Sequence, residues 1–227
     1  LPQSDGPPVG RMQDAVAQLR RVVAAVRARN GGRRVALIGH SWGGSVAAHY
    51  AGQYPQDVHA LALLAPIVCR TPITGPAPAP PGQSHYPVTL LGQYRRFIED
   101  VPRGQPQVLG EAHFLAWGIQ YLGSDPASAR RVPPSVITPS GPLADIGALW
   151  SGRSLYDPRR IVAPTLLVRG AWDSLCTDAD AEHLLAALGS ERKWDCRIER
   201  GTHLLHLESQ RTALHARVNL FLQGVME

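Results

Sequence analysis

The chain has 227 residues, of which 44% are hydrophobic and 18% are charged, and its formal net charge is +5 at pH 7. This length and apolar content allow a sizeable core, which excludes a disordered protein and fits one domain with an inserted subdomain. Every basic residue except Lys193 is an arginine, and the arginines are scattered in ones and twos. Because nucleic-acid-binding proteins concentrate basic residues on one face or tract, we expect no nucleic-acid partner.

Membrane segments and metal sites are not expected either. No run approaches the ~18 consecutive apolar residues of a membrane helix, and the first eight residues lack the pattern of a signal peptide. Cys69, Cys176 and Cys196 form no C-x-x-C motif and cannot make a disulfide framework, which favours free thiols and a cytoplasmic location. The nine histidines show no metal-ligand spacing, so we expect neither a metal nor another cofactor.

The first third of the chain predicts helices and strands in alternation. Residues 35–38 and 58–65 are short, nearly all-apolar runs, typical of parallel strands covered on both faces. Residues 43–54, rich in small side chains, predict a helix between them. A preceding helix is expected over 12–29, because apolar residues recur there at helical spacing. They are Val16, Leu19, Val22, Val23 and Val26.

The composition changes at residue 71. Residues 71–82 are crowded with proline, alanine and glycine, as in an irregular linker, and helical pieces without strand alternation follow. Order returns with a strand at 165–169, a helix at 179–188, a strand at 195–199 and a helix at 212–222. This alternation predicts a mostly parallel α/β sheet flanked by helices, with core segments 1–70 and 157–227 and a helical cap inserted at 71–156.

The sequence Gly39-His40-Ser41-Trp42-Gly43 fits G-x-S-x-G, the nucleophile elbow. The serine of this motif sits on a strained turn between a strand and a helix, where side chains two residues before or after it would clash with the backbone. The turn also places the serine at a helix N-terminus, where free N–H groups favour negative charge. A turn that is merely structural is the alternative.

An activated serine needs a base, and the base needs an orienting carboxylate. Asp173 and His203 each follow a predicted strand and a glycine, so both fall at the carboxyl edge of the sheet with Ser41. Asp178 is a rival acid, but like Asp180 it fits the start of a helix, where carboxylates act as caps. His206 is a rival base, although its leucine neighbours favour a packed histidine.

These residues resemble the α/β-hydrolase superfamily, and in particular its cap-bearing serine esterases. The resemblance covers nearly the whole chain outside the cap. It implies Ser41 as nucleophile, His203 as general base and Asp173 as its orienting acid, with the backbone N–H of Trp42 as half of the oxyanion hole. The matching motifs are Gly-His-Ser-Trp-Gly-Gly at 39–44, Leu-Val-Arg-Gly-Ala-Trp-Asp at 167–173 and Gly-Thr-His at 201–203.

The sequence departs from the family pattern at its N-terminus. Family members carry several strands before the elbow and a His-Gly loop that donates the second oxyanion N–H. No His-Gly pair precedes Ser41 here, and barely thirty residues precede the elbow strand. We therefore expect an N-terminally incomplete α/β-hydrolase fold.

The predicted cap is rich in aromatic residues, which fits a lid over an apolar substrate and fits packing of the lid onto the core equally well. We expect His40, Trp117, Tyr121 and Trp150 to contact substrate. The predicted function is hydrolysis of a carboxylic ester or lactone through an acyl-enzyme. Amide or C–C bond hydrolysis by the same triad remains open, as do a non-catalytic small-molecule-binding protein on this scaffold and the oligomeric state.

Overall fold

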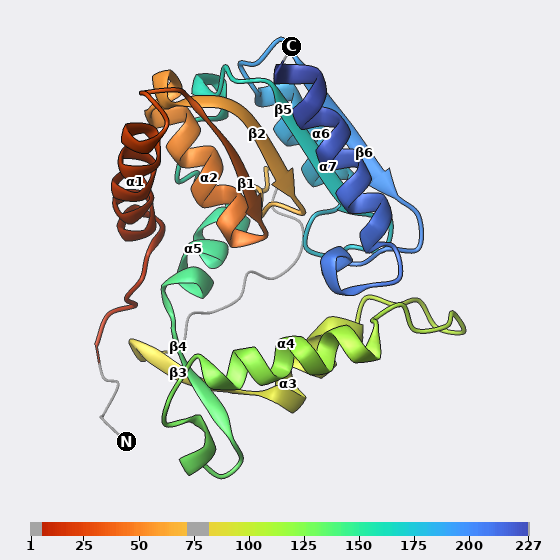
Figure 1. Cartoon of the computed structure of the whole chain (residues 1–227). Coiled ribbons are helices and arrows are strands. Elements are labelled where there is room, and N and C mark those ends of the chain that lie inside the picture. Colours follow the sequence, from red (N-terminus) through yellow and green to blue (C-terminus); the bar gives the residue numbers. More distant parts are fainter. Residues whose placement is uncertain (1–5, 72–81, 227) are drawn as a thin grey trace.

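The structure is a computed structural model that describes residues 6–71 and 82–226 (Figure 1). Its main sheet has four parallel strands in the order β1-β2-β5-β6. The predicted parallel α/β architecture is therefore confirmed. The strands are β1 (Val35–His40), β2 (Val58–Leu64), β5 (Thr165–Gly170) and β6 (Lys193–Ile198).

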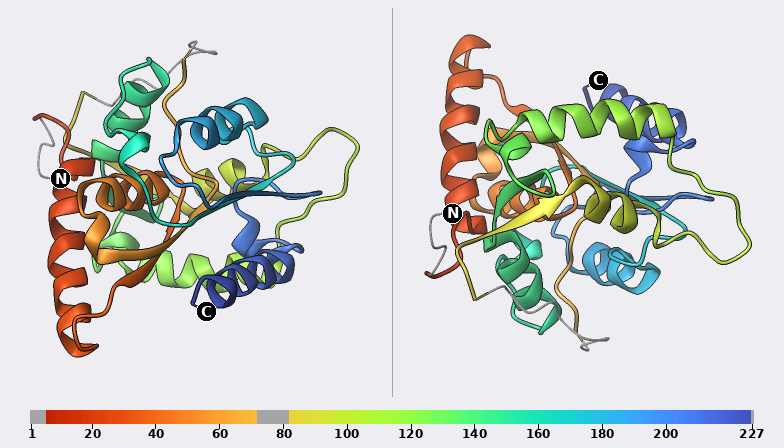
Figure 2. Two further views of the ribbon diagram at one scale, coloured as in Figure 1. Left: turned by 90° about the horizontal axis from the view of Figure 1, so that it is seen from above. Right: turned by 90° about the horizontal axis from the view of Figure 1, so that it is seen from below.

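Helices cover both faces of this sheet, and Figure 2 shows α6 and α7 on opposite sides of it. The core helices are α1 (Met12–Arg29), α2 (Trp42–Gln53), α5 (Gly141–Trp150), α6 (Asp178–Ala187) and α7 (Arg211–Met226). Short 3-10 turns join them at Pro55–Asp57, Pro158–Arg160 and Leu205–Leu207. The predicted core elements match to within two residues at each end, except that α7 runs four residues further.

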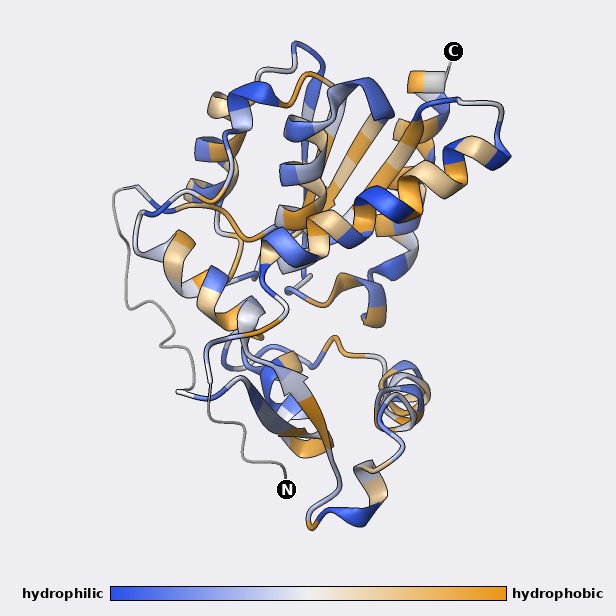
Figure 3. Cartoon of the chain, turned by 90° about the vertical axis from the view of Figure 1, so that its left-hand side faces the viewer, coloured by the Kyte–Doolittle hydropathy of each residue, from blue (hydrophilic) through white to orange (hydrophobic). Residues whose placement is uncertain are grey.

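Alternation along the two central strands divides the core into two layers. Leu61, Leu63 and Leu167 face one layer, where they pack with α1, α2 and α6. Their neighbours Ala62 and Val168 face the other layer, where α7 packs. Side chains of a strand point alternately to opposite faces of the sheet. When helices cover both faces, nearly every residue of the strand must therefore be apolar. Figure 3 shows these strands as the apolar centre of the molecule.

Strand β1 is covered on one face only. Val35 and Leu37 pack into the layer of α1 and α2. On the other face, Ile38 is 55% exposed, because α7 lies over the other three strands. The predicted apolar face of α1 was too broad: Val16 and Val23 are buried as expected, but Val22 is 57% exposed and Val26 38% exposed.

The segment predicted as a helical cap, 71–156, differs from the prediction in two ways: it is not purely helical, and its last helix, α5, packs with the core. The name cap is kept below for residues 82–139. This cap contains α3 (Leu90–Ile98) and α4 (Glu111–Gly123), a 3-10 turn at Ser128–Arg130, and an antiparallel pair of strands, β3 (His85–Thr89) and β4 (Ser135–Pro139). Proline obscured these strands in the sequence, because it cannot donate to a sheet ladder. A two-stranded sheet consists of edges alone, so Pro87 and Pro139 are tolerated. The predicted linker falls mostly at 72–81, outside the described residues.

No helix among the described residues is long and apolar enough to span a bilayer.

Candidate active site

The turn that carries Ser41 is strained in the way an elbow requires. Ser41 has φ +57° and ψ −129°, follows the last residue of β1 and caps α2. A Cβ on Gly39 would lie 2.5 Å from the carbonyl oxygen of Gly43 and 2.7 Å from Cα of Gly44, so only glycine fits at position 39. The expectation of a second clash at Gly43 was wrong, because a Cβ there meets no atom within 4 Å. The second close approach is at Gly44, against Pro66.

The two loops that bring in the acid and the histidine cross closely. A Cβ on Gly170, the last residue of β5, would overlap the carbonyl of Gly201. The Trp172 N–H donates to that same carbonyl at 2.9 Å. This contact fixes the segment after β5 against the segment after β6, and with it the relative positions of Asp173 and His203.

The three predicted residues meet at the carboxyl edge of the sheet. His203 Nε2 lies 2.8 Å from Ser41 Oγ, and His203 Nδ1 lies 3.1 and 3.0 Å from the two carboxylate oxygens of Asp173. The His203 and Asp173 residues are 4% and 6% exposed, so this chain of hydrogen bonds is screened from water. With a proton on Nδ1, Nε2 is free to accept the serine proton, which is the arrangement that activates a hydroxyl.

Local hydrogen bonds orient the Asp173 carboxylate. Its Oδ1 accepts from the backbone N–H groups of Leu175 and Cys176 at 2.8 and 3.0 Å. The rival acids act elsewhere. Asp178 pairs with Arg169, while Asp180 closes a capping box at the start of α6 and pairs with Arg70. Asp180 therefore caps the helix as the sequence indicated, whereas Asp178 lies in the first turn of α6 and forms ion pairs.

A second buried carboxylate supports the segment that carries His203. Glu208 is fully buried, and its carboxylate accepts from the N–H of Thr202 at 2.9 Å and from the Thr202 hydroxyl. Burial raises the pKa of Glu208 above its usual value, and these hydrogen bonds oppose the shift. No sequence pattern predicted this role, because Glu208 follows an ordinary leucine-rich stretch.

The cap rests on this same segment. Leu204 and Leu207 pack with Phe97 and Phe114 of the cap, and Gly110 N–H donates to the Leu207 carbonyl at 2.9 Å. The loop of the predicted base is therefore held between the core and the cap.

A third buried carboxylate joins helix α5 to the turn that carries Ser41. Asp145, on α5, is 1% exposed and accepts from the indole N–H of Trp42 at 3.2 Å, from Met12 N–H at 2.7 Å and from Arg11 at 2.6 Å. Asp145 thus links Trp42, the residue after Ser41, to helix α5 and to the start of α1. Sequence analysis missed Asp145, which lies 103 residues away from Trp42.

The residues expected to contact substrate have protein partners. Trp117 stacks on Tyr121 at a ring separation of 4.8 Å, and the Tyr121 hydroxyl donates to the Val88 carbonyl. Trp150 lies under the Arg70 guanidinium, 4.0 Å from the ring centre. His40 faces His203. Packing accounts for these positions, and their contact with substrate stays a prediction.

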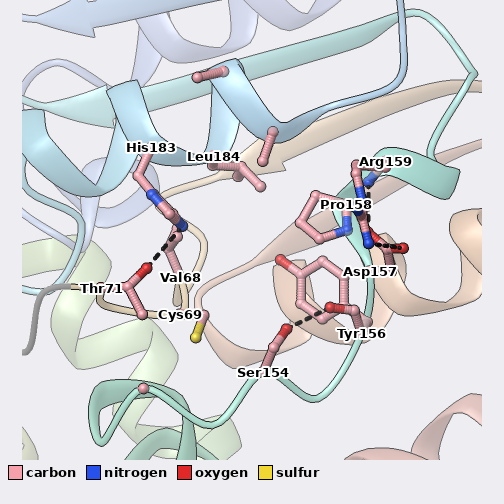
Figure 4. A pocket seen from close by; sticks show the side chains of 13 residues that line it. Val68, Cys69, Thr71, Ser154, Tyr156, Asp157, Pro158, Arg159, His183 and Leu184 are labelled. Atoms are coloured by element: carbon pink, nitrogen blue, oxygen red, sulfur yellow. Dashed lines mark hydrogen bonds and ion pairs between the residues drawn. The ribbon is translucent and has the colours of Figure 1, made fainter.

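A separate pocket of about 380 Å³ lies between the segment after β2 and helix α6 (Figure 4). Cys69, Tyr156 and His183 line it, and none of the triad residues does. Burial raises the pKa of the Cys69 thiol, so the thiol is less reactive than a free cysteine. Burial likewise raises the pKa of Cys176, beside Asp173, which gives that thiol no nucleophilic role.

A parallel sheet with helices on both faces, and with a serine, a histidine and an aspartate brought together at its carboxyl edge, defines an α/β protein of the hydrolase type. A family model of the alpha/beta hydrolase fold matches residues 2–210, and the chain belongs to this family. No curated protein sequence matches the chain.

Solved structures share the fold at low sequence identity. One of the metagenome-derived lipolytic enzymes LipS and LipT is 17% identical, with a TM-score of 0.59 over 95% of this chain and 74% of that one. The monoacylglycerol lipase of Paleococcus ferrophilus is 15% identical, with a TM-score of 0.55 over 94% and 76%. The CarC enzyme, a serine hydrolase involved in carbazole degradation, is 15% identical, with a TM-score of 0.58 over 96% and 74%.

Proposed function

We propose that the protein is a serine hydrolase that cleaves a carboxylic ester or lactone through an acyl-enzyme. The observation that carries this proposal is the unbroken series of hydrogen bonds from Ser41 through His203 to Asp173. Membership of the α/β-hydrolase family and the likeness of the fold to lipolytic enzymes support it.

The reaction proceeds in two halves. Ser41 Oγ attacks the carbonyl carbon while His203 Nε2 takes its proton, and Asp173 holds the imidazole and stabilises its positive charge. The tetrahedral intermediate collapses, His203 protonates the leaving alcohol, and an acyl-serine remains. Water then attacks this ester with His203 as base again, which releases the acid and restores the hydroxyl.

The oxyanion of each tetrahedral intermediate needs hydrogen-bond donors. Trp42 begins α2, so its N–H has no partner within the helix and serves as one donor. The link from its indole to Asp145 fixes the orientation of this residue. The chemistry of the proposed reaction needs no cofactor.

Labelling with a fluorophosphonate probe tests the proposal directly. We expect covalent labelling of the wild-type protein and none of Ser41→Ala, together with hydrolysis of a p-nitrophenyl ester by the wild type only. A folded wild-type protein that is neither labelled nor active would favour a small-molecule-binding protein on this scaffold. Labelling without ester hydrolysis would favour an amide or C–C bond as the substrate of the same triad.

A further inference from the structure

The backbone carbonyl of His203 accepts a hydrogen bond from the side chain of His40, which lies 163 residues away in the sequence. The His40 Nε2–H donates to this oxygen at 2.8 Å, and no backbone N–H of the described residues donates to it. The 3-10 turn that follows begins its hydrogen bonds one residue later, from Leu207 to Leu204. Since His203 is 4% exposed, water cannot readily replace a lost donor, and a buried carbonyl without a partner is costly.

The His40 ring is suited to this single donor role. A carbonyl oxygen only accepts, so His40 carries its proton on Nε2. Burial, together with the neighbouring His203 and His206, lowers the pKa of His40 to about 3. The ring therefore stays neutral at every pH at which an esterase would be assayed, and the hydrogen bond persists there.

Ring contacts restrict both imidazoles. The His40 ring lies 5.0 Å from the His203 ring, tilted by 43°, and 4.7 Å from the His206 ring, nearly edge-on. His40 is also the last residue of β1 and directly precedes Ser41. His40 and Ser41, which are consecutive in the chain, therefore both contact His203: Ser41 contacts its ring, and His40 contacts its backbone carbonyl.

We propose that His40 is a positioning residue, which keeps the His203 imidazole within reach of Ser41 by holding the backbone from which that imidazole projects. This inference rests on the proposed function. It assigns His40 a role within the protein in place of the predicted contact with substrate. Without the donor, the His203 backbone turns to find another partner and carries the ring away from Ser41, and small displacements of this kind cost large factors in rate.

Two substitutions separate the donor from the ring. His40→Phe keeps a planar ring and removes the N–H, whereas His40→Gln keeps an N–H donor at about the reach of Nε2. The readouts are kcat and KM for a p-nitrophenyl ester, the rate of fluorophosphonate labelling, and the downfield proton resonance of His203 Nδ1–H, which reports its bond to Asp173.

We expect His40→Phe to lower kcat and the labelling rate by roughly tenfold or more, with KM changed by less than about twofold. We expect His40→Gln to recover most of this loss, and the Nδ1–H resonance to shift or broaden only in His40→Phe. Recovery by glutamine distinguishes positioning from packing, because glutamine does not replace the ring.

Three outcomes would overturn the inference. Unchanged kcat in His40→Phe shows that the donor is dispensable, and a raised KM at constant kcat makes His40 a substrate contact. Equal losses in both variants, with equal losses of thermal stability, make it a packing residue. If the wild-type protein is neither labelled nor able to hydrolyse esters, the proposed function is wrong. The Nδ1–H resonance of His203 then still tests whether His40 positions this residue. The resonance in His40→Gln serves the same purpose if His40→Phe does not fold.

Discussion

The core and the cap of this protein are stabilised in different ways. In the core, four parallel strands align by backbone hydrogen bonds, and the proposed triad follows from where three of them end. In the cap, helices α3 and α4 meet through ring contacts such as that of Trp117 with Phe97, and the Tyr121 hydroxyl of α4 donates to the Val88 carbonyl of β3. Residues at the strand ends are positioned by the regular geometry of the sheet, whereas the cap is held by side-chain contacts, including those with the segment that carries His203.

The largest expected effects are on the triad itself. Asp173→Asn and His203→Ala should each lower hydrolysis of a p-nitrophenyl ester by about 10³-fold or more. In Asp173→Asn the imidazole is no longer held in the required tautomer, and in His203→Ala the serine has no base. Asp178→Asn is the matched control and should retain activity within about twofold. If Asp178→Asn lost activity while Asp173→Asn kept it, Asp178 would be the acid. The acid would then lie in a helix and not directly after a strand.

The next largest effect concerns the elbow. Gly39→Ala forces a Cβ into the backbone of α2 and should lower the free energy of unfolding by about 3 kcal/mol. Gly43→Ala has open space at its Cβ, and alanine favours the helix, so its effect should lie between neutral and about 1 kcal/mol of stabilisation. Urea unfolding measures both variants. Equal destabilisation would mean that position 43 is as crowded as the G-x-S-x-G pattern suggests.

The cap offers a test of packing against substrate contact. Trp117→Ala removes a ring shared by Phe97, Phe114 and Tyr121 and should lower stability by about 2 kcal/mol. Ile119→Ala, at a position that is 71% exposed on the same helix, should change stability by less than about 0.5 kcal/mol. A higher KM for Trp117→Ala at unchanged melting temperature would instead make the residue part of a binding surface.

The smallest expected effect is on the pH dependence of stability. Burial lowers the pKa values of His40 and His206 in the folded state, so the unfolded state binds more protons below the ordinary pKa of 6.5. The contribution of these two neutral histidines to the free energy of unfolding is therefore fully present above pH 6.5, and it is lost as the pH drops below this value. Melting temperatures measured from pH 7.5 to pH 5 should decline, and His40→Phe should reduce the decline. A melting temperature that rises on acidification would contradict these shifts.

Regular geometry decided what could be predicted from the sequence. Ser41, Asp173 and His203 could be placed together because parallel strands end at one edge of a sheet. The roles of His40, Asp145 and Glu208 could not be predicted, because each depends on a side chain meeting a partner that local sequence does not specify. The cap strands escaped notice because Pro87 and Pro139 hid their alternation, and packing of α1 was overestimated because Val22 and Val26 lie outside the narrow buried face of this helix.

The one-sided cover of β1 has a practical consequence for measurements on this protein. Ser41 follows an edge strand that is covered on one face only, so we expect this strand to fray in mild urea while the central strands stay intact. Catalytic turnover and probe labelling would then disappear at lower denaturant concentrations than far-UV circular dichroism. Loss of activity in mild urea would therefore report local fraying of β1 and not unfolding of the whole sheet.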